Sequence, residues 1–409
     1  MSGDLDREIS EYAASALLRY FRRGAQVDVK QPRIDAERDR ELLRAHWALS
    51  APVRALAEYV LLHRHETQSL LISRRRVDDA VARGRIDALA TTLHRLRTGT
   101  ATSIVAYEPI RTFDTGPNQV LAWVVHNAAL FAARFQTLQT PESAYSLLAE
   151  NLANQINQIR RLDFLREALR SPAIQRRPTP GTLRDATRSR RIVYRLAVEA
   201  YNTLIGIEAG HEDAIRTVIN STLVGPLEPW RCFEIAVAMS IGEALEAILK
   251  SPLHLSLLAG DTALPILTCG PLVLYWQQAT NLYQTPAMEP SEAIVKDILS
   301  NYEIGTGASR PDLLLVDASS ARVVAIIEVK YLAGDNAPVR FREAVEQIVR
   351  YGRGYASGKD LFSLLGRSLV AMSAGAPDLI QPPTEGVPRA IDFSGIKKDG
   401  LHSWVGLVH

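Results

Sequence analysis

Three charged residues between positions 312 and 330 have the types and the spacing that phosphodiester cleavage needs. Asp312 opens an apolar run over 312–316 that predicts a β-strand, and Glu328 and Lys330 lie in a second such run over 323–331. Because side chains alternate between the two faces of a strand, Glu328 and Lys330 leave the same face. Two carboxylates on adjacent strands offer the hard oxygen ligands that Mg²⁺ (or Mn²⁺) prefers.

An ion held by Asp312 and Glu328 would polarise a phosphoryl oxygen and lower the pKa of a bound water, so that hydroxide is available near neutral pH. Lys330 can orient this water or stabilise the charge that develops on the phosphate. The backbone carbonyl of Val329 is a further candidate metal ligand. A purely structural interpretation stays open, since Asp312 could cap a strand and Glu328 and Lys330 could be a solvated pair on an edge strand.

The elements around these residues are predicted from the same stretch. Residues 317–322 form a polar turn between two Val/Ile/Leu-rich segments, which predicts a β-hairpin. A helix is predicted over 340–353, with Gln347 and Tyr351 one turn apart on it. Function or simple core packing would each explain a tyrosine at that spacing.

Pro311-Asp312 followed by Glu328-Val329-Lys330 resembles the PD-(D/E)xK motif of the restriction-endonuclease-like nuclease superfamily. Gln347 and Tyr351 resemble the QxxxY element of its RecB-like branch, in which these residues help to position DNA and the catalytic lysine. The resemblance implies that the catalytic residues are Asp312, Glu328, Lys330, Gln347 and Tyr351.

The superfamily also commonly supplies an acid from the helix before the hairpin. A helix is predicted over residues 291–302, and Glu292 is the preferred candidate for a further metal ligand, ahead of Glu289 and Glu303.

The fold class expected from the whole chain is α+β. A large, mainly α-helical N-terminal region over residues 1–255 precedes an α/β domain of the restriction-endonuclease type with a central mixed sheet, over residues 256–409. In this domain, strands are predicted on both sides of Gly270-Pro271, in SLVAMSAG and in the final SWVGLVH, in addition to the hairpin. Residues 1–100 are predicted to be helical, and the Pro-, Gly- and Arg-rich run 171–187 is predicted to be a linker with a sub-boundary.

The most basic stretch of the chain lies between Arg160 and Arg195, where arginine is used throughout. Arginine suits bidentate contact with phosphate, so DNA binding is one interpretation of this stretch and a solvated helical face is the other. The candidate nucleic-acid-binding residues are Arg176, Arg177, Arg188, Arg190 and Arg191.

A segment further upstream resembles the N-terminal region of defence-associated nucleases of the McrC-like and DUF2357 type. Arg111, Asp114, Thr115 and Asn118 match its R-x-x-D-T-P-E-N-R-like pattern, whereas Gly116-Pro117 and Gln119 depart from it. Asp114 or Thr115 can cap the helix that follows. The resemblance implies an anti-phage or restriction system and an AAA+ NTPase partner.

Composition limits the other classes of function. The chain has 409 residues, a net charge of +2 and two cysteines, too few for a disulfide framework or a four-cysteine metal site. No membrane span or signal peptide is predicted, which leads us to expect a soluble cytoplasmic protein. GYASGKD, residues 354–360, lacks the glycine spacing of a phosphate loop, so no nucleotide site is predicted.

The sequence therefore predicts a Mg²⁺-dependent endonuclease that cleaves DNA. Two alternatives stay open. One is an assembly or DNA-binding subunit that keeps the nuclease fold without its activity, and the other is an RNA-cleaving effector. The oligomeric state is also open, a homo-oligomer included.

Overall fold

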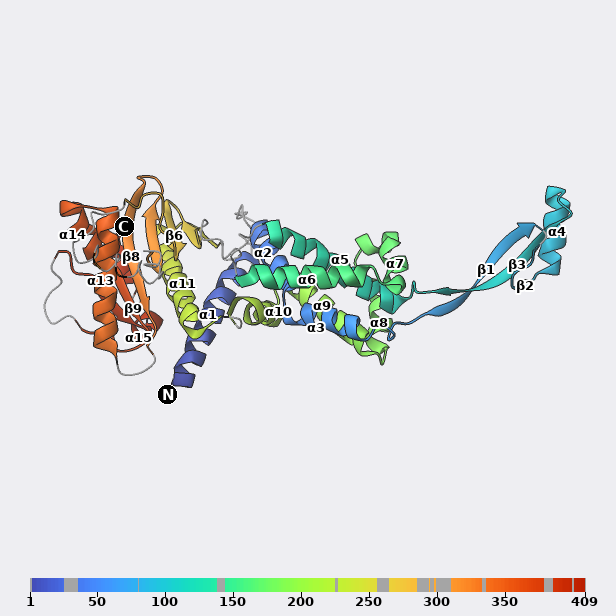
Figure 1. Cartoon of the computed structure of the whole chain (residues 1–409), viewed down its shortest axis with the longest axis horizontal. Coiled ribbons are helices and arrows are strands. Elements are labelled where there is room, and N and C mark those ends of the chain that lie inside the picture. The colour runs from blue at the N-terminus through green and yellow to red at the C-terminus, as the bar shows by residue number, and fades with distance from the viewer. Residues whose placement is uncertain are drawn as a thin grey trace. The chain divides into compact units, whose positions relative to one another are not determined.

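A computed structural model shows an α+β protein with helices in its first part and a mixed seven-stranded sheet in its last part (Figure 1). The structure describes residues 2–25, 36–79, 81–137, 144–224, 227–255, 265–284, 294, 298, 310–332, 336–378, 385–398 and 401–408. The fold class is the one predicted from the sequence. Among the described residues, no helix is long and apolar enough to span a membrane.

Contacts divide the chain into two compact units. The first unit comprises Met1–His46, Phe135–Leu147 and Gly206–His409, and the second comprises Trp47–Arg134 and Leu148–Ile205. The domain boundary near residue 255 stays a prediction.

The sheet of the first unit has the strand order β10-β9-β8-β7-β6-β5-β4. Pairing is parallel for β8–β9 and β9–β10 and antiparallel for the other pairs, so the sheet is mixed, as predicted. The strands are β4 (Leu253–Leu255), β5 (Leu267–Cys269), β6 (Leu272–Trp276), β7 (Leu313–Asp317), β8 (Arg322–Lys330), β9 (Leu369–Met372) and β10 (Arg389–Asp392). The predicted hairpin is thus β7–β8, and the strands predicted around Gly270-Pro271 are β5 and β6.

Two helices, α13 (Ala337–Tyr355) and α14 (Gly358–Arg367), pack against β8 and close one hydrophobic core. Apolar residues of α13, α14 and three strands meet in this core, among them Leu314, Ile326 and Ile348, all 0% exposed. The helix α11 (Pro229–Leu249) also packs on the sheet, against β4, β5 and β8, and α1 (Ser2–Ala25) packs against α11. Nearly every side chain of α11 from Cys232 to Leu245 is buried, because this apolar helix is covered on several sides.

The C-terminal strand predicted in SWVGLVH is wrong. This segment belongs to the helix α16 (Leu401–Val408), which contacts α11 and α14. Leu401, Trp404, Val405 and Val408 are buried, at the three- and four-residue spacing of a helix face. The last strand of the sheet is instead β10, which pairs parallel to β9 and is followed by the short helix α15 (Phe393–Lys397).

The remaining helices lie in the N-terminal part of the chain. They are α2 (Ala36–Ala48), α3 (Ala51–Leu62), α5 (Gly116–Thr137), α6 (Ala144–Arg160), α7 (Asp163–Arg170), α8 (Pro180–Arg188), α9 (Ile192–Glu208) and α10 (Glu212–Val218), with a 3₁₀ turn η1 (Pro172–Gln175) and a π-helical segment η2 (Ile219–Val224). The run predicted to be a linker contains η1 and most of α8. Thr179 caps α8 by accepting a hydrogen bond from the Thr182 amide, which explains how this Pro- and Gly-containing segment begins a helix.

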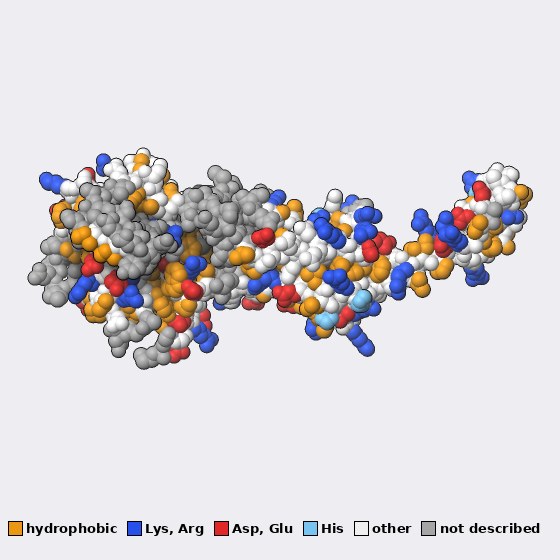
Figure 2. All heavy atoms as spheres, in the orientation of Figure 1, with side chains coloured by type: hydrophobic (Ala, Val, Ile, Leu, Met, Phe, Trp, Pro, Cys, Tyr) orange, Lys and Arg blue, Asp and Glu red, His pale blue; other side chains and the backbone are white. Residues whose placement is uncertain are grey.

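The prediction that residues 1–100 are helical is wrong for a long strand, β1 (Leu70–Asp79). It pairs antiparallel with β3 (Ser103–Thr112) over ten positions, from Leu70 opposite Thr112 to Asp79 opposite Ser103. A short strand β2 (Arg85–Ile86) and the helix α4 (Ala88–Thr98) complete this arm of the second unit. Basic and apolar side chains are both exposed along it, as Figure 2 shows.

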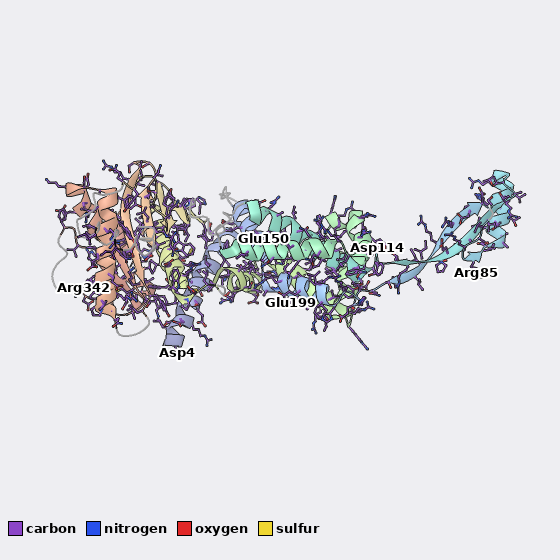
Figure 3. The ribbon with its side chains drawn as sticks, in the orientation of Figure 1. Asp4, Arg85, Asp114, Glu150, Glu199 and Arg342 are labelled. Carbon is purple, nitrogen blue, oxygen red and sulfur yellow. The ribbon has the colours of Figure 1, made fainter. Side chains whose placement is uncertain are left out.

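The base of the arm is held by a buried amide. The Asn118 side-chain amide at the start of α5 donates to the backbone oxygens of Gln68 (2.8 Å) and Phe113 (2.7 Å), one on each side of the arm. Its oxygen accepts from the Tyr194 hydroxyl, which in turn accepts from the Gln68 amide. Asp114 marks this base in Figure 3, and Arg85 marks the far part of the arm. The side chain of one asparagine thus joins both ends of the arm to the helices.

We expect Asn118→Ala to lower the free energy of unfolding by about 2–3 kcal/mol, because it leaves two half-buried carbonyls and the buried Tyr194 hydroxyl without this partner. Urea denaturation measures the change. Asn127→Ala, further along α5, removes only a bond from the side chain to the carbonyl of Trp123 and is the matched control. Equal losses for the two variants would contradict a special role for Asn118.

Candidate active site

The β7–β8 pairing brings the predicted acids together. Leu313 lies opposite Ile327, so Asp312, just before β7, comes beside Glu328 near the end of β8. The Val329 amide donates a 2.8 Å hydrogen bond to Asp312 Oδ2, which fixes this carboxylate against the neighbouring strand. The apolar strands therefore place two carboxylates at the same corner of the sheet.

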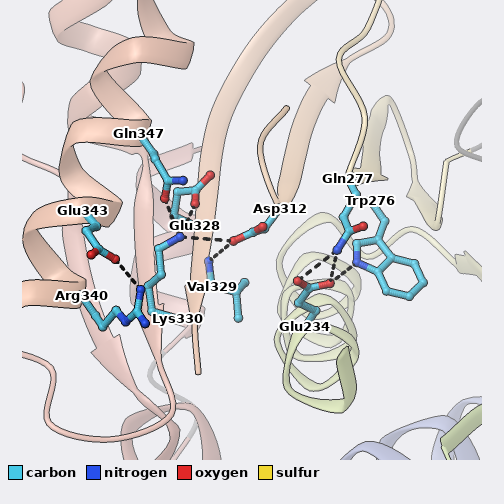
Figure 4. A network of polar contacts seen from close by, with 10 residues as sticks. All are labelled: Glu234, Trp276, Gln277, Asp312, Glu328, Val329, Lys330, Arg340, Glu343 and Gln347. Atoms are coloured by element: carbon cyan, nitrogen blue, oxygen red, sulfur yellow. Dashed lines mark hydrogen bonds and ion pairs between the residues drawn. The ribbon is translucent and has the colours of Figure 1, made fainter. Parts of the chain in front are cut away.

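Lys330 lies between these carboxylates (Figure 4). Its Nζ is 2.9 Å from Glu328 Oε2 and 3.9 Å from Asp312 Oδ2, and it donates a 2.5 Å hydrogen bond to Gln347 Oε1 on α13. Glu328, Lys330 and Gln347 thus meet from a strand and a helix. The lysine is oriented from two sides, which leaves its charge directed at the space between the acids.

Glu328 is a buried carboxyl of which one oxygen pairs with Lys330 and the other has no partner among the described residues. The residue is 1% exposed, and its Oε1 has no hydrogen-bond partner within the part of the chain that the structure describes. Burial, and next the negative charge of Asp312, raise the pKa of Glu328 to about 8, although Lys330 acts in the opposite direction. Without a cation, the Glu328 carboxyl therefore keeps its proton to a higher pH than an exposed glutamate does.

Tyr351 is placed differently from Gln347. Its side chain is 6% exposed and belongs to the hydrophobic core between α13 and the sheet. Burial, and next the negative charges of Glu328 and Asp312, raise the pKa of the Tyr351 hydroxyl. The ring therefore lies near the two acids. Packing accounts for its burial, and its catalytic role stays a prediction.

A third acid, Glu234 on α11, lies on the other side of Asp312 in Figure 4 and was not among the predicted residues. It is 3% exposed and accepts hydrogen bonds from the Trp276 indole and from Gln277 Nε2, the latter at 3.0 Å. Burial, and next the charge of Asp312, raise the pKa of Glu234 to about 8. Two buried carboxyls thus flank Asp312, and both respond to its charge.

The backbone beside Glu234 is built around Asp312 as well. The backbone N–H of Gln277 donates a 2.7 Å hydrogen bond to the backbone carbonyl of Asp312. Gln277 has a φ of 49°, a left-handed conformation that residues other than glycine rarely adopt. Such conformations cost free energy and persist where the surroundings hold them, often at functional sites. The sequence signal for Glu234 is an acid in the otherwise uncharged stretch of α11 from Cys232 to Gly242.

The structure does not test the predicted metal ligand Glu292 or its two alternatives. Glu292, Glu289 and Glu303 lie outside the described residues. Glu234 instead supplies an acid from a helix that precedes the hairpin.

The five arginines predicted to bind nucleic acid line two cavities of the second unit. Arg188, Arg190 and Arg191 surround one of about 460 Å³ together with Thr115 and Gly116 at the start of α5. A second cavity, of about 350 Å³, is lined by Arg176, Arg177, Gln119 and Trp123. The structure groups these side chains, and nucleic-acid binding by them stays a prediction.

The side chains around Asp312 and Glu328 fit a magnesium ion better than a metal held by protein alone. Among the described residues, no group of three or more His, Cys, Asp or Glu side chains could hold a metal ion. Mg²⁺ is usually bound through one or two carboxylates and keeps several waters, with substrate phosphate completing its shell. Asp312 and Glu328 supply that number of carboxylates, and the unpartnered Glu328 Oε1 is an oxygen that a cation would satisfy.

Comparison with known proteins gives a distant likeness among solved structures. No protein-family model matches this sequence, and no curated protein matches it. Among solved structures, the chain is similar to one in an assembly of McrB AAA+ hexamers with bound McrC from Thermococcus gammatolerans, at 11% sequence identity and a TM-score of 0.28. The similarity covers 87% of this chain, which spans 66% of the length of that one.

Proposed function

We propose that this protein is a Mg²⁺-dependent endonuclease that cleaves phosphodiester bonds in DNA. The observation that carries the proposal is the meeting of Asp312, Glu328 and Lys330 at one corner of the sheet, with a buried carboxylate oxygen that lacks a partner among the described residues. Burying such a group costs free energy unless it is compensated, so the arrangement calls for a cation.

Each residue has a distinct task in this proposal. Bound Mg²⁺ supplies a Lewis acid for the phosphoryl oxygen and a water of lowered pKa. Asp312 and Glu328 hold the ion, with the carbonyl of Val329 as a further ligand. Lys330 stabilises negative charge that develops on the phosphate, and Gln347 fixes the direction of its ammonium group through their hydrogen bond. Glu234 is a positioning residue, because it accepts from the side chain of Gln277, whose backbone N–H in turn donates to the carbonyl of Asp312.

The arginines of the second unit support a nucleic-acid substrate. Guanidinium groups bind phosphate in bidentate fashion, and the two cavities lined by Arg176, Arg177, Arg188, Arg190 and Arg191 offer such groups to a nucleic-acid backbone. We propose DNA as the substrate, with RNA as the alternative that the experiment below tests.

We also propose that the enzyme works in a restriction or anti-phage defence system with an AAA+ NTPase. The support is the resemblance of Arg111, Asp114, Thr115 and Asn118 to the McrC-like pattern. The similar solved structure contains McrC with McrB AAA+ hexamers. Cleavage should therefore be measured with and without any AAA+ protein that a neighbouring gene encodes.

The test is a cleavage assay on supercoiled DNA and on RNA, with Mg²⁺, Mn²⁺ or EDTA. We expect DNA cleavage with either metal and none with EDTA. Asp312→Asn is expected to lower the rate at least a hundredfold, since it weakens a metal ligand. Asp317→Asn, at the far end of the same strand, is the matched control, because Asp317 only holds a turn through Ser319 and Ser320.

Cleavage of RNA but not of DNA would show that RNA is the substrate. Equal activity of Asp312→Asn and Asp317→Asn would contradict the metal site. No cleavage by any form with the AAA+ protein present would favour the other role considered above, an assembly subunit with an inactive nuclease fold.

A further inference from the structure

A basic cavity lies at the end of the nuclease sheet opposite the candidate active site. Arg322 begins β8, whereas Glu328 and Lys330 end it. Arg322 and Glu328 are six positions apart along this extended strand, which corresponds to about 20 Å at roughly 3.3 Å per residue. The cavity is therefore distinct from the acids that would hold the metal.

Three arginines from three elements line this cavity. Arg322 comes from β8, Arg353 from α13 and Arg367 from the end of α14, and the cavity has a volume of about 370 Å³. Asp360 is the acid in the lining, and Ser357 and Gln284 add neutral polar groups. The positive groups thus outnumber the negative ones on walls contributed by separate parts of the unit.

Two of these arginines lack an anionic partner. Neither Arg322 nor Arg367 forms an ion pair with any residue that the structure describes. Arg367 Nε is buried and has no hydrogen-bond partner there, although the backbone oxygen of Arg367 accepts from the Trp404 indole. A buried guanidinium nitrogen without an acceptor costs free energy, so an anion in the cavity would compensate it.

We propose that this cavity binds the phosphate group of a nucleotide. Phosphate is the anion that converging guanidinium groups match best, because each arginine can give two parallel hydrogen bonds. The volume of the cavity lies within the range of small-molecule sites. A phosphate with an attached sugar would therefore fill it better than a lone phosphate ion. Recognition here is by side chains; the segment 354–360 that borders the cavity is not a phosphate loop.

Such a phosphate could come from a free nucleotide or from the end of a nucleic-acid chain. The first would make the cavity an effector site on the nuclease unit. The second would anchor a substrate end at about 20 Å from the acids, which corresponds to about six base pairs of duplex at roughly 3.4 Å each. Both sources present the same chemistry to Arg322, Arg353 and Arg367.

The experiment measures binding by the full-length protein in EDTA, so that its result does not depend on cleavage. Calorimetry with AMP and with inorganic phosphate tests the free ligand. Fluorescence anisotropy with 5′-phosphorylated and 5′-hydroxyl DNA oligonucleotides tests the chain end. The variants are Arg322→Gln and Arg367→Gln, with Arg7→Gln as the control, because Arg7 is an exposed arginine of α1 that pairs with Glu11.

We expect wild-type protein to bind AMP, or to prefer the 5′-phosphorylated oligonucleotide, and each cavity variant to weaken that binding roughly tenfold. The anisotropy result would also show a salt slope lowered by about one for each lost contact. Arg322→Gln guards against a folding defect of Arg367→Gln, since Arg322 is exposed. The proposal would be overturned if both variants bound every probe with an affinity within twofold of that of the wild type. This holds whatever the outcome of the cleavage assay.

Discussion

Replacing Lys330 by alanine is expected to lower the rate of DNA cleavage by roughly a thousandfold, the range measured when one preorganised charge-stabilising group is removed. The reason is local. Lys330 Nζ is the positive group within 4 Å of both Asp312 and Glu328, and Gln347 holds it there.

The measurement is a cleavage time course with Mg²⁺, together with DNA affinity in EDTA and a thermal denaturation curve. Lys398→Ala, at an exposed lysine of the same unit, is the control and should behave as wild type. Gln347→Ala should cost about tenfold, because it frees the lysine without removing it. If Lys330→Ala cleaves at the rate of Lys398→Ala, this lysine has no part in the reaction.

Protein without metal is expected to lose stability as the pH rises from about 5 to 8, by on the order of 3 kcal/mol for each buried carboxyl. Glu328 and Glu234 have an ordinary pKa of 4.5 that the fold raises to about 8. A raised pKa means that the folded state binds more protons than the unfolded state between these values. The stability that the neutral carboxyls provide is therefore complete below pH 4.5 and lost as the pH passes 8.

Urea denaturation at a series of pH values in EDTA measures this loss. Glu328→Gln keeps a neutral group at every pH, so it should flatten the profile and exceed the stability of wild type at pH 8. Glu346→Gln, at an exposed position of α13, should keep the wild-type profile. Added Mg²⁺ should restore wild-type stability at pH 8, since it binds the folded state alone. Identical profiles for the two variants would rule out a buried, proton-holding Glu328.

The hairpin and the helix α13 could be predicted because their signals are local. Apolar runs around a polar turn specify β7 and β8, and the alternation of side chains is enough to put Glu328 and Lys330 on one face. Gln347 follows from helical spacing. These residues meet because each lies on an element whose sequence alone determines its form.

Glu234 could not be predicted because its position depends on long-range packing. Nothing near it in the chain shows that α11 will lie against the sheet or that Asp312 will be its neighbour. The same limit explains β1, whose side chains are nearly all exposed and carry no alternation of burial; its strand conformation comes from pairing with β3. The helix α16 was mistaken for a strand because a short apolar run fits either form until its packing is known.

The two-stranded arm has a consequence for how its surface can change. Its strands are joined by main-chain bonds along their length, and β1 buries almost none of its side chains. Substitutions on that strand therefore meet no packing constraint, while the ladder and the Asn118 anchor keep the register. The outer surface of the arm is free to diversify, by mutation or by engineering, while the pairing of β1 with β3 is kept.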